Sequence, residues 1–179
     1  MPEADPLDAI PRLPLAHLPT PLEPAPRLGE AIGLPQLQIK RDDATGLALG
    51  GNKARKLEYL LAEAQADGAT VLITTGGAQS NHARMTAAAA CRLGMRCLLV
   101  LADAPPAEEQ GNLLLDRWFG AEVRFLPDAS LAELERAMES AARELANRGE
   151  RPYIIPVGGS TPLGCLGYVR AVRELAVQA

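Results

Sequence analysis

The sequence predicts an α/β fold, a three-layer structure in which a mainly parallel, twisted sheet is flanked by helices on both faces. From about residue 53 onward, short β-rich runs alternate with helical segments, the pattern of crossover connections between parallel strands. Residues 71–75 form a short continuous β-rich run, which is typical of a strand covered on both faces. The 179 residues are 47% hydrophobic but only 3% aromatic, so we expect an aliphatic core.

The first 50 residues differ from the rest because proline is dense in them, with eight prolines up to residue 26. Proline fixes φ and has no backbone N–H, so we expect an extended arm laid over the body, without helix and with little ladder pairing. Residues 37–41 then alternate like a half-buried strand, and a loop from Asp42 to Gly51 follows. The leucines that could anchor the arm are Leu13, Leu15, Leu18 and Leu22.

The later elements follow one another regularly. A helix begins near Lys53, carries an apolar face and ends at Gly68. Another helix is predicted over 131–148, because Ser130 is suited to cap it and Glu133 stands at the capping-box position. The remaining predicted strands are 71–75, 97–101, 122–126 and 153–157, and the remaining predicted helices are 80–93, 107–119 and one that follows the glycine turn at 158–161.

Composition and charge exclude several classes of function. The net charge of −4 and the pI near 5.3 argue against a nucleic-acid-binding protein. No apolar run approaches the length of a membrane span, and the acidic residues 1–5 do not resemble a signal peptide. The three cysteines share no metal-ligand spacing, so we expect reduced thiols, and two histidines do not suggest a metal site. We therefore expect a cytoplasmic protein without a metal, membrane or nucleic-acid partner.

The most informative segment is residues 50–58, Gly-Gly-Asn-Lys-Ala-Arg-Lys-Leu-Glu. Its two glycines bring Asn52 and Lys53 to the start of a helix, where the helix dipole disfavours an ammonium group. We therefore expect the pKa of Lys53 to be lowered. A neutral lysine can attack a carbonyl carbon and hold it as a Schiff base. A solvated lysine without a chemical role is the alternative.

A second polar motif, Gln79-Ser80-Asn81-His82, lies where a predicted strand passes into a helix. Such side chains can simply cap the helix, or they can form a pocket for a carboxylate together with backbone N–H groups. A further glycine turn occupies residues 158–161. Neither turn matches the dinucleotide-binding fingerprint or the phosphate-binding loop, so nicotinamide and nucleoside triphosphate functions are poorly supported.

Taken together, these motifs resemble those of the D-cysteine desulfhydrase and 1-aminocyclopropane-1-carboxylate deaminase family. The resemblance runs from about Leu13 to residue 179 and implies a pyridoxal 5'-phosphate enzyme of the tryptophan-synthase-β-like fold. The segments that carry it are residues 20–22 with 27–28, 50–58, 79–84, 155–160 and 163–168.

The resemblance implies a role for each candidate residue, with Lys53 as the lysine that forms the Schiff base with the cofactor and moves the substrate α-proton. The implied catalytic residues are Lys53, Ser80 and His82, the cofactor contacts are Lys53, Asn52 and Asn81, and the substrate contacts are Gln79, Ser80, Asn81 and His82. Desulfhydrases of the family carry a histidine at position 82 and deaminases usually a glutamine. The resemblance therefore favours β-elimination on D-cysteine or a close analogue, giving pyruvate, ammonia and sulfide.

Two other functions stay open: ring-opening deamination of the cyclopropane amino acid, and a binding or scaffold domain without catalysis. Family members are about twice as long, so the resemblance implies an incomplete larger domain, weak cofactor binding and weak or absent turnover. A homodimer is expected for the full-length protein. The expected division is an arm and strand of the larger domain at 1–50, the smaller α/β domain at 51–157, and the return into the larger domain at 158–179.

Overall fold

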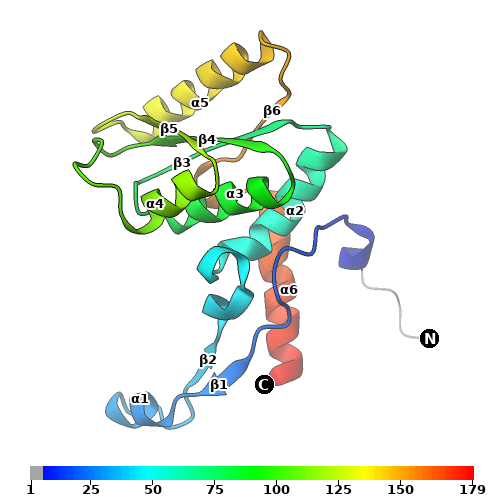
Figure 1. Cartoon of the computed structure of the whole chain (residues 1–179). Helices are drawn as coiled ribbons and strands as arrows, with labels where there is room; N and C mark the ends of the chain where they lie inside the picture. The colour runs from blue at the N-terminus through cyan, green and yellow to red at the C-terminus, as the bar shows by residue number, and fades with distance from the viewer. Residues whose placement is uncertain (1–5) are drawn as a thin grey trace.

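The computed structural model describes residues 6–179 and contains two separate sheets (Figure 1). The larger sheet is parallel with the strand order β5-β4-β3-β6, and β1 pairs with β2 in a small antiparallel sheet. The strands are β1 (Leu22–Pro24), β2 (Gln38–Lys40), β3 (Val71–Gly76), β4 (Arg96–Leu101), β5 (Glu122–Phe125) and β6 (Pro152–Ile154). The helices are α1 (Pro26–Ala31), α2 (Lys53–Ala66), α3 (Asn81–Arg92), α4 (Gly111–Trp118), α5 (Leu131–Ala146) and α6 (Pro162–Gln178), with short 3₁₀ helices η1 (Pro6–Ala9), η2 (Asp42–Thr45), η3 (Leu47–Leu49) and η4 (Val157–Gly159).

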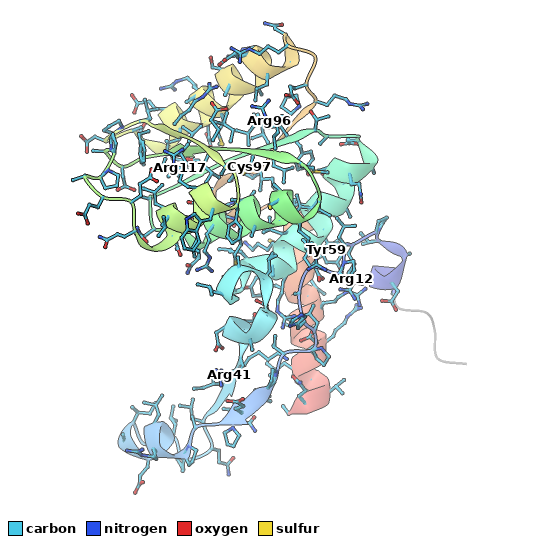
Figure 2. All side chains as sticks on the ribbon, viewed as in Figure 1. Arg12, Arg41, Tyr59, Arg96, Cys97 and Arg117 are labelled. Carbon is cyan, nitrogen blue, oxygen red and sulfur yellow. The ribbon has the colours of Figure 1, made fainter. Side chains whose placement is uncertain are left out.

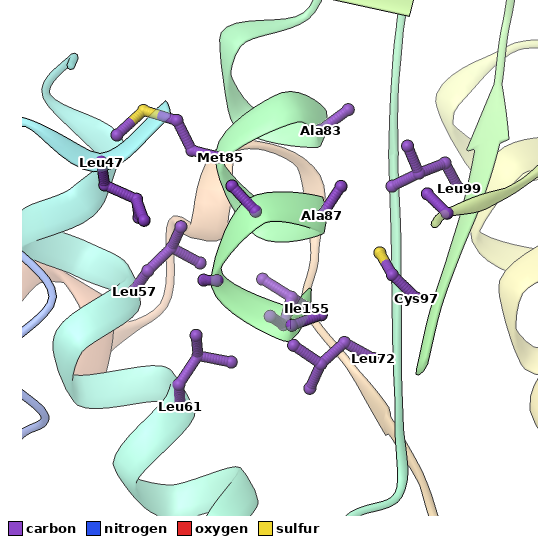
Figure 3. Packing of buried hydrophobic residues seen from close by; sticks show 14 of the residues in the cluster. Leu47, Leu57, Leu61, Leu72, Ala83, Met85, Ala87, Cys97, Leu99 and Ile155 are labelled. Atoms are coloured by element: carbon purple, nitrogen blue, oxygen red, sulfur yellow. The ribbon is translucent and has the colours of Figure 1, made fainter. Parts of the chain in front are cut away.

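Helices cover both faces of the parallel sheet, which confirms the predicted three-layer α/β fold. Alternate residues of β3 point to opposite faces: Val71 and Ile73 pack against α5, whereas Leu72 packs against the cluster formed with α2, α3 and α4. Figure 3 shows the cluster that contains Leu72, with Leu57 of α2 and Ala87 of α3 on the helix side. All of these residues are buried, and the core is aliphatic as expected.

The prediction for the first 26 residues was wrong in part, because the described portion of the arm contains η1, β1 and the start of α1. Pro6 and Pro26 each occupy the first position of a helix, where a missing N–H costs no intrahelical hydrogen bond. Pro24 ends a strand of the two-stranded sheet, where ladder pairing is least demanding. Residues 1–5, read above as an acidic segment unlike a signal peptide, lie outside the described residues.

Two later boundaries also differ from the prediction. Helix α4 begins at Gly111 and not near residue 107, because Gly111 has a φ of +60° and the preceding Gln110 is extended. Strand β6 ends at Ile154, since Pro156 has no N–H to donate and the chain turns into η4. The capping box at the start of α5 is confirmed: Ser130 Oγ accepts from the backbone N–H of Glu133, and the Glu133 carboxylate accepts from the backbone N–H of Ser130.

Helix α2 ties the arm and α6 to the body through buried charges. The Glu58 carboxylate accepts hydrogen bonds from the backbone N–H groups of Leu15 and Ala16, both at 3.0 Å, and pairs with Arg12 at 2.7 Å. Arg12 lies beside α2 in Figure 2. The buried guanidinium of Arg55 bonds both the Asp42 loop and Glu174 of α6, at 2.8 and 2.9 Å. These contacts fix the loop that leads into Lys53.

Cys91, Cys97 and Cys165 are all free, as predicted for reduced thiols. Across residues 6–179, no helix has the combination of length and apolar character needed to cross a membrane.

Candidate active site

Three glycine-containing segments meet at the carboxyl ends of β3 and β6, where ligands bind in open parallel sheets. They are the loop before α2, the turn between β3 and α3, and η4 after β6. A Cβ atom added to Gly158 would lie 3.5 Å from Lys53 Nζ, and one added to Gly159 would lie 3.5 Å from His82 Cε1. Lys53 and His82 therefore border the same glycine turn, although 29 residues separate them in sequence.

The loop before α2 holds Lys53 in place through an unusual backbone. Gly50 has a φ of +76°, and a Cβ there would overlap the carbonyl oxygen of Asp43, so only glycine fits. Gly51 donates its N–H to Thr45 Oγ1 at 2.8 Å, and its carbonyl accepts from the same hydroxyl. Asn52 is the N-cap residue of α2, but its side chain makes no capping hydrogen bond.

The pKa of Lys53 is lowered, as predicted, mainly because the amine is partly buried and secondly because the positive charge of Lys56 lies nearby. The prediction attributed the lowered pKa to the helix dipole, whereas in the structure burial and the neighbouring cation also lower it. The Lys56 ammonium donates to Ser160 Oγ at 2.8 Å and to the Gly158 carbonyl at 3.2 Å, and its side chain is buried. The sequence analysis gave Lys56 no role, although the spacing of three residues places it on the helix face of Lys53.

Ser80 is the N-cap residue of α3, and its Oγ accepts from the backbone N–H of Ala83 at 3.2 Å. A Cβ added to Gly76 would lie 2.6 Å from this hydroxyl oxygen, so glycine is required for Ser80 to approach the end of β3. The capping interpretation of Ser80 is therefore confirmed. Its contact with a substrate carboxylate stays a prediction.

Gln79 and Asn81 face the start of α4, where Asn112 contacts both of them. The backbone N–H of Asn112 donates to Gln79 Oε1 at 2.9 Å, and its side-chain amide donates to the Gln79 carbonyl at 2.7 Å and to Asn81 Oδ1 at 3.0 Å. The Gln79 side-chain amide in turn donates to the carbonyl of Gln110. Both polar ends of the Gln79 side chain are thus engaged within the protein, and its role toward a substrate stays a prediction.

Arg84 connects this polar turn to the loop before Lys53. Its guanidinium donates to the Gly50 carbonyl at 2.8 Å and to Asn112 Oδ1 at 3.0 Å, while its Nε has no hydrogen-bond partner in the part of the chain that the structure describes. Nearby Asp116 is fully buried, and neither of its carboxylate oxygens has a hydrogen-bond partner within residues 6–179. Burial raises the pKa of Asp116 to about 7, against the opposing charges of Arg84 and Arg117. Sequence reasoning missed this group because Arg84, Asn112 and Asp116 come together only in the folded chain.

His82 is buried, with 4% of its surface exposed. Its Nε2 lies 2.9 Å from the Thr74 hydroxyl, and no described residue is a partner of its Nδ1 in hydrogen-bond geometry. Burial, followed by the charges of Lys53 and Lys56, lowers the pKa of His82 to about 4, and the backbone of Pro156 opposes the shift. The imidazole at this site is therefore neutral at physiological pH.

Comparison with known proteins agrees with this geometry. A family model described as "Pyridoxal-phosphate dependent enzyme" matches residues 13–179, which include every candidate residue discussed above. The chain belongs to this family. Within it, the resemblance to D-cysteine desulfhydrases and 1-aminocyclopropane-1-carboxylate deaminases is also confirmed by the relatives that the chain matches.

A protein of Pyrococcus horikoshii, provisionally named a 1-aminocyclopropane-1-carboxylate deaminase, is 47% identical over 97% of this chain and 52% of its own length. A protein of Salmonella paratyphi B named D-cysteine desulfhydrase is 44% identical over 96% of this chain and 53% of its own length. A crystal structure described as an ACC deaminase homologue superimposes with a TM-score of 0.90 at 47% identity, over 97% of this chain and 52% of the homologue. The chain thus spans about half the length of the relatives it matches.

Proposed function

We propose that this chain carries the reactive lysine of a pyridoxal-phosphate-dependent lyase that acts by β-elimination on D-cysteine or a close analogue, giving pyruvate, ammonia and sulfide. One observation carries the proposal: Lys53, whose pKa is lowered, borders the glycine turn of η4 beside the neutral ring of His82. The desulfhydrase and deaminase names of the relatives support the reaction class.

The residues of the site fit the chemistry of the cofactor. An aldehyde requires an amine that loses its proton readily, and Lys53 has the lowered pKa that this requires. A phosphorylated ligand requires cationic donors, and the buried ammonium of Lys56 lies next to the same turn. When bound, pyridoxal phosphate would supply a ring that stabilises negative charge on the substrate Cα. Asn52 and Asn81 are the further cofactor contacts that we propose.

The chain's own groups would then bind the substrate and move its proton. The N-terminus of α3, with Ser80 at its cap, is suited to a substrate carboxylate because the helix dipole favours negative charge there. The neutral amine of Lys53 would hold or move the proton at the substrate Cα. His82, together with Gln79 and Asn81, would border the substrate. A ring-opening deaminase is the second candidate, because relatives with this name match the chain equally well.

We also propose the division of the chain stated above, with an arm at 1–50, a smaller α/β domain at 51–157 and a return segment at 158–179. The whole protein is proposed to be a cytoplasmic homodimer. The family resemblance implies that the phosphate cradle and the partner of the pyridine nitrogen lie beyond the matched half, so we expect weak cofactor binding and poor turnover of these 179 residues alone.

The chain offers a sharp test because it contains only three lysines, Lys40, Lys53 and Lys56. The protein is incubated with pyridoxal phosphate, reduced with borohydride and digested, and the labelled peptide is identified by mass. We expect the label on Lys53, its loss in Lys53→Arg and its retention in Lys40→Arg. Lys40 is the matched control because its ammonium is already paired with Glu174 at 3.0 Å. No label at saturating cofactor, or equal labelling of all three lysines, would overturn the proposal.

The choice between the two reactions requires a protein of the family's full length. Sulfide release from D-cysteine is compared with ammonia release from 1-aminocyclopropane-1-carboxylate. We expect sulfide release to dominate, and a dominant deaminase activity would contradict the desulfhydrase assignment.

A further inference from the structure

Thr74 lies beneath His82 of the candidate active site, near the carboxyl end of the inner strand β3. It is fully buried, and its hydroxyl oxygen lies 2.7 Å from the Ile155 carbonyl oxygen and 2.9 Å from His82 Nε2. The hydroxyl is therefore the middle member of a chain that runs from the imidazole to the backbone just after β6. Sequence analysis assigned Thr74 only to a buried strand.

The order of donors along this chain follows from counting hydrogens. A carbonyl oxygen can only accept, and a threonine hydroxyl has one hydrogen to give. Thr74 therefore donates to Ile155, since otherwise two oxygens would face each other at 2.7 Å without a proton between them. Its lone pairs are left for His82, so Nε2 must carry the hydrogen and donate to Thr74. In a neutral ring, this leaves Nδ1 with a lone pair.

The unprotonated Nδ1 is one of the buried polar atoms near the site that lack a partner within residues 6–179. It is buried and has no hydrogen-bond partner among the described residues, although buried polar atoms are normally paired. The ring edge at Cε1 lies against Gly159, next to the Gly158 position that borders Lys53 Nζ. The positive charges of Lys53 and Lys56 both act on the ring, and the backbone of Pro156 opposes them as a hydrogen-bond acceptor.

We propose that Thr74 is a positioning residue: it holds His82 in the Nε2–H tautomer, so that Nδ1 serves as a hydrogen-bond acceptor for an N–H donor at the Lys53 site. The functional part of this inference rests on the proposed role of Lys53, whereas the tautomer does not. His82 can then accept a proton or a hydrogen bond from the site but cannot give one through Nδ1. A threonine-to-valine change at position 74 keeps the shape of the side chain and removes only the hydroxyl.

The neighbouring Thr75 provides a matched control. It is equally buried, and its hydroxyl donates to the Val100 carbonyl at 2.7 Å, on the opposite face of the strand and without a histidine. Thr75→Val removes the same kind of hydrogen bond from the same strand. It should therefore disturb the packing of β3 to a similar degree and leave the tautomer of His82 unchanged.

The experiment is nitrogen-15 NMR of the imidazole rings, at neutral pH and without cofactor, on the full 179-residue chain. Only His17 and His82 are present, and His17→Gln assigns the two signals. We expect the Nε2–H tautomer for His82 in the wild type, in Thr74→Ser and in Thr75→Val, and a mixture of tautomers or the Nδ1–H form in Thr74→Val. An Nδ1–H ring in the wild type, or an unchanged tautomer in Thr74→Val, would overturn the proposal. Should Thr74→Val fail to fold, the wild-type and Thr74→Ser spectra still decide it.

A second arm tests the acceptor role of Nδ1. Lys53→Met should shift the Nδ1 resonance of His82, whereas Lys40→Met should not, and an unmoved Nδ1 signal in Lys53→Met would overturn this part. Failure of the proposed function would look different: the lysine would not be labelled by pyridoxal phosphate, while the tautomer and its dependence on Thr74 would be as stated.

Discussion

The pH dependence of stability should reveal Asp116, the buried carboxylate of α4. Burial raises its pKa from the ordinary 3.8 to about 7. The folded chain therefore keeps a proton that the unfolded chain releases between these two values. Because the unfolded state binds fewer protons over this range, the free energy of unfolding falls as the pH rises from about 4 to about 7.

The size of the effect follows from the two pKa values. The interval between 3.8 and about 7, at about 1.4 kcal/mol per pH unit, corresponds to about 4 kcal/mol once Asp116 is fully ionised. Asp116→Asn keeps the shape of the side chain and removes the ionisation. Relative to the wild type, this variant should therefore gain up to about 4 kcal/mol in free energy of unfolding between low and neutral pH.

Urea unfolding, followed by circular dichroism at several values from about pH 4.5 to about pH 8, measures the difference between the two chains. The comparison cancels the titration of all other groups that the variant does not touch. We expect a difference that grows steadily with pH and levels off above about pH 7. A difference that stays constant over the whole range would refute the reasoning, because it would show that Asp116 ionises at the same pH in the folded and unfolded states.

Three further predictions concern a glycine of the lysine loop, the cap of α5 and the buried ion pairs of Arg55. Each is checked by urea unfolding against the wild type. Gly50→Ala should destabilise the fold far more than the control Gly94→Ala. Gly94 has a φ of +68° but open space around its Cβ position, so its substitution should cost about 1–2 kcal/mol. Similar losses in the two variants would contradict the clash with Asp43. Ser130→Ala should cost about 1 kcal/mol by removing the cap of α5, and no loss would refute the capping role. Arg55→Met should cost about 3 kcal/mol or more, because it leaves Asp42 without its cation and Glu174 with Lys40 alone, and an unchanged stability would show that the pairs contribute nothing.

The sequence was sufficient for the part of the fold that depends on local signals. Helix α5 is an example: the cap at Ser130, the apolar period and the stop near Gly149 all lie within the helix and its flanks. The same holds for α2, α3, β3 and β4. Where a boundary depended on a single backbone angle, as at Gly111, the prediction erred by several residues. The arm was misjudged because proline forbids the interior of a helix but not its first position.

The candidate site was predictable to the extent that parallel strands end at one edge of a sheet. This rule predicts that the turn at 79–82 and the turn at 158–161 lie at the same edge, and the family resemblance adds the lysine loop to them. The sequence did not predict which residues hydrogen-bond to the side chains of these segments. Thr74 and Ile155 are 81 residues apart, and Gln79 and Asn112 are 33 residues apart, yet each pair shares a hydrogen bond. Such pairings depend on distances that a sequence does not contain.

The electrostatics of the site argue for an anionic ligand. Among residues 6–179, the basic groups of Lys53, Lys56 and His82 lie around the η4 turn, and no carboxylate there shifts the pKa of Lys53 or of His82. The charge of Lys56 lowers the pKa of Lys53, and the charges of Lys53 and Lys56 lower the pKa of His82. An anion bound here would reverse this effect and raise the pKa of both groups, so anion binding and proton uptake are coupled. A binding domain for cationic or neutral partners would gain nothing from this arrangement, whereas a site for a phosphorylated cofactor and an amino-acid carboxylate would.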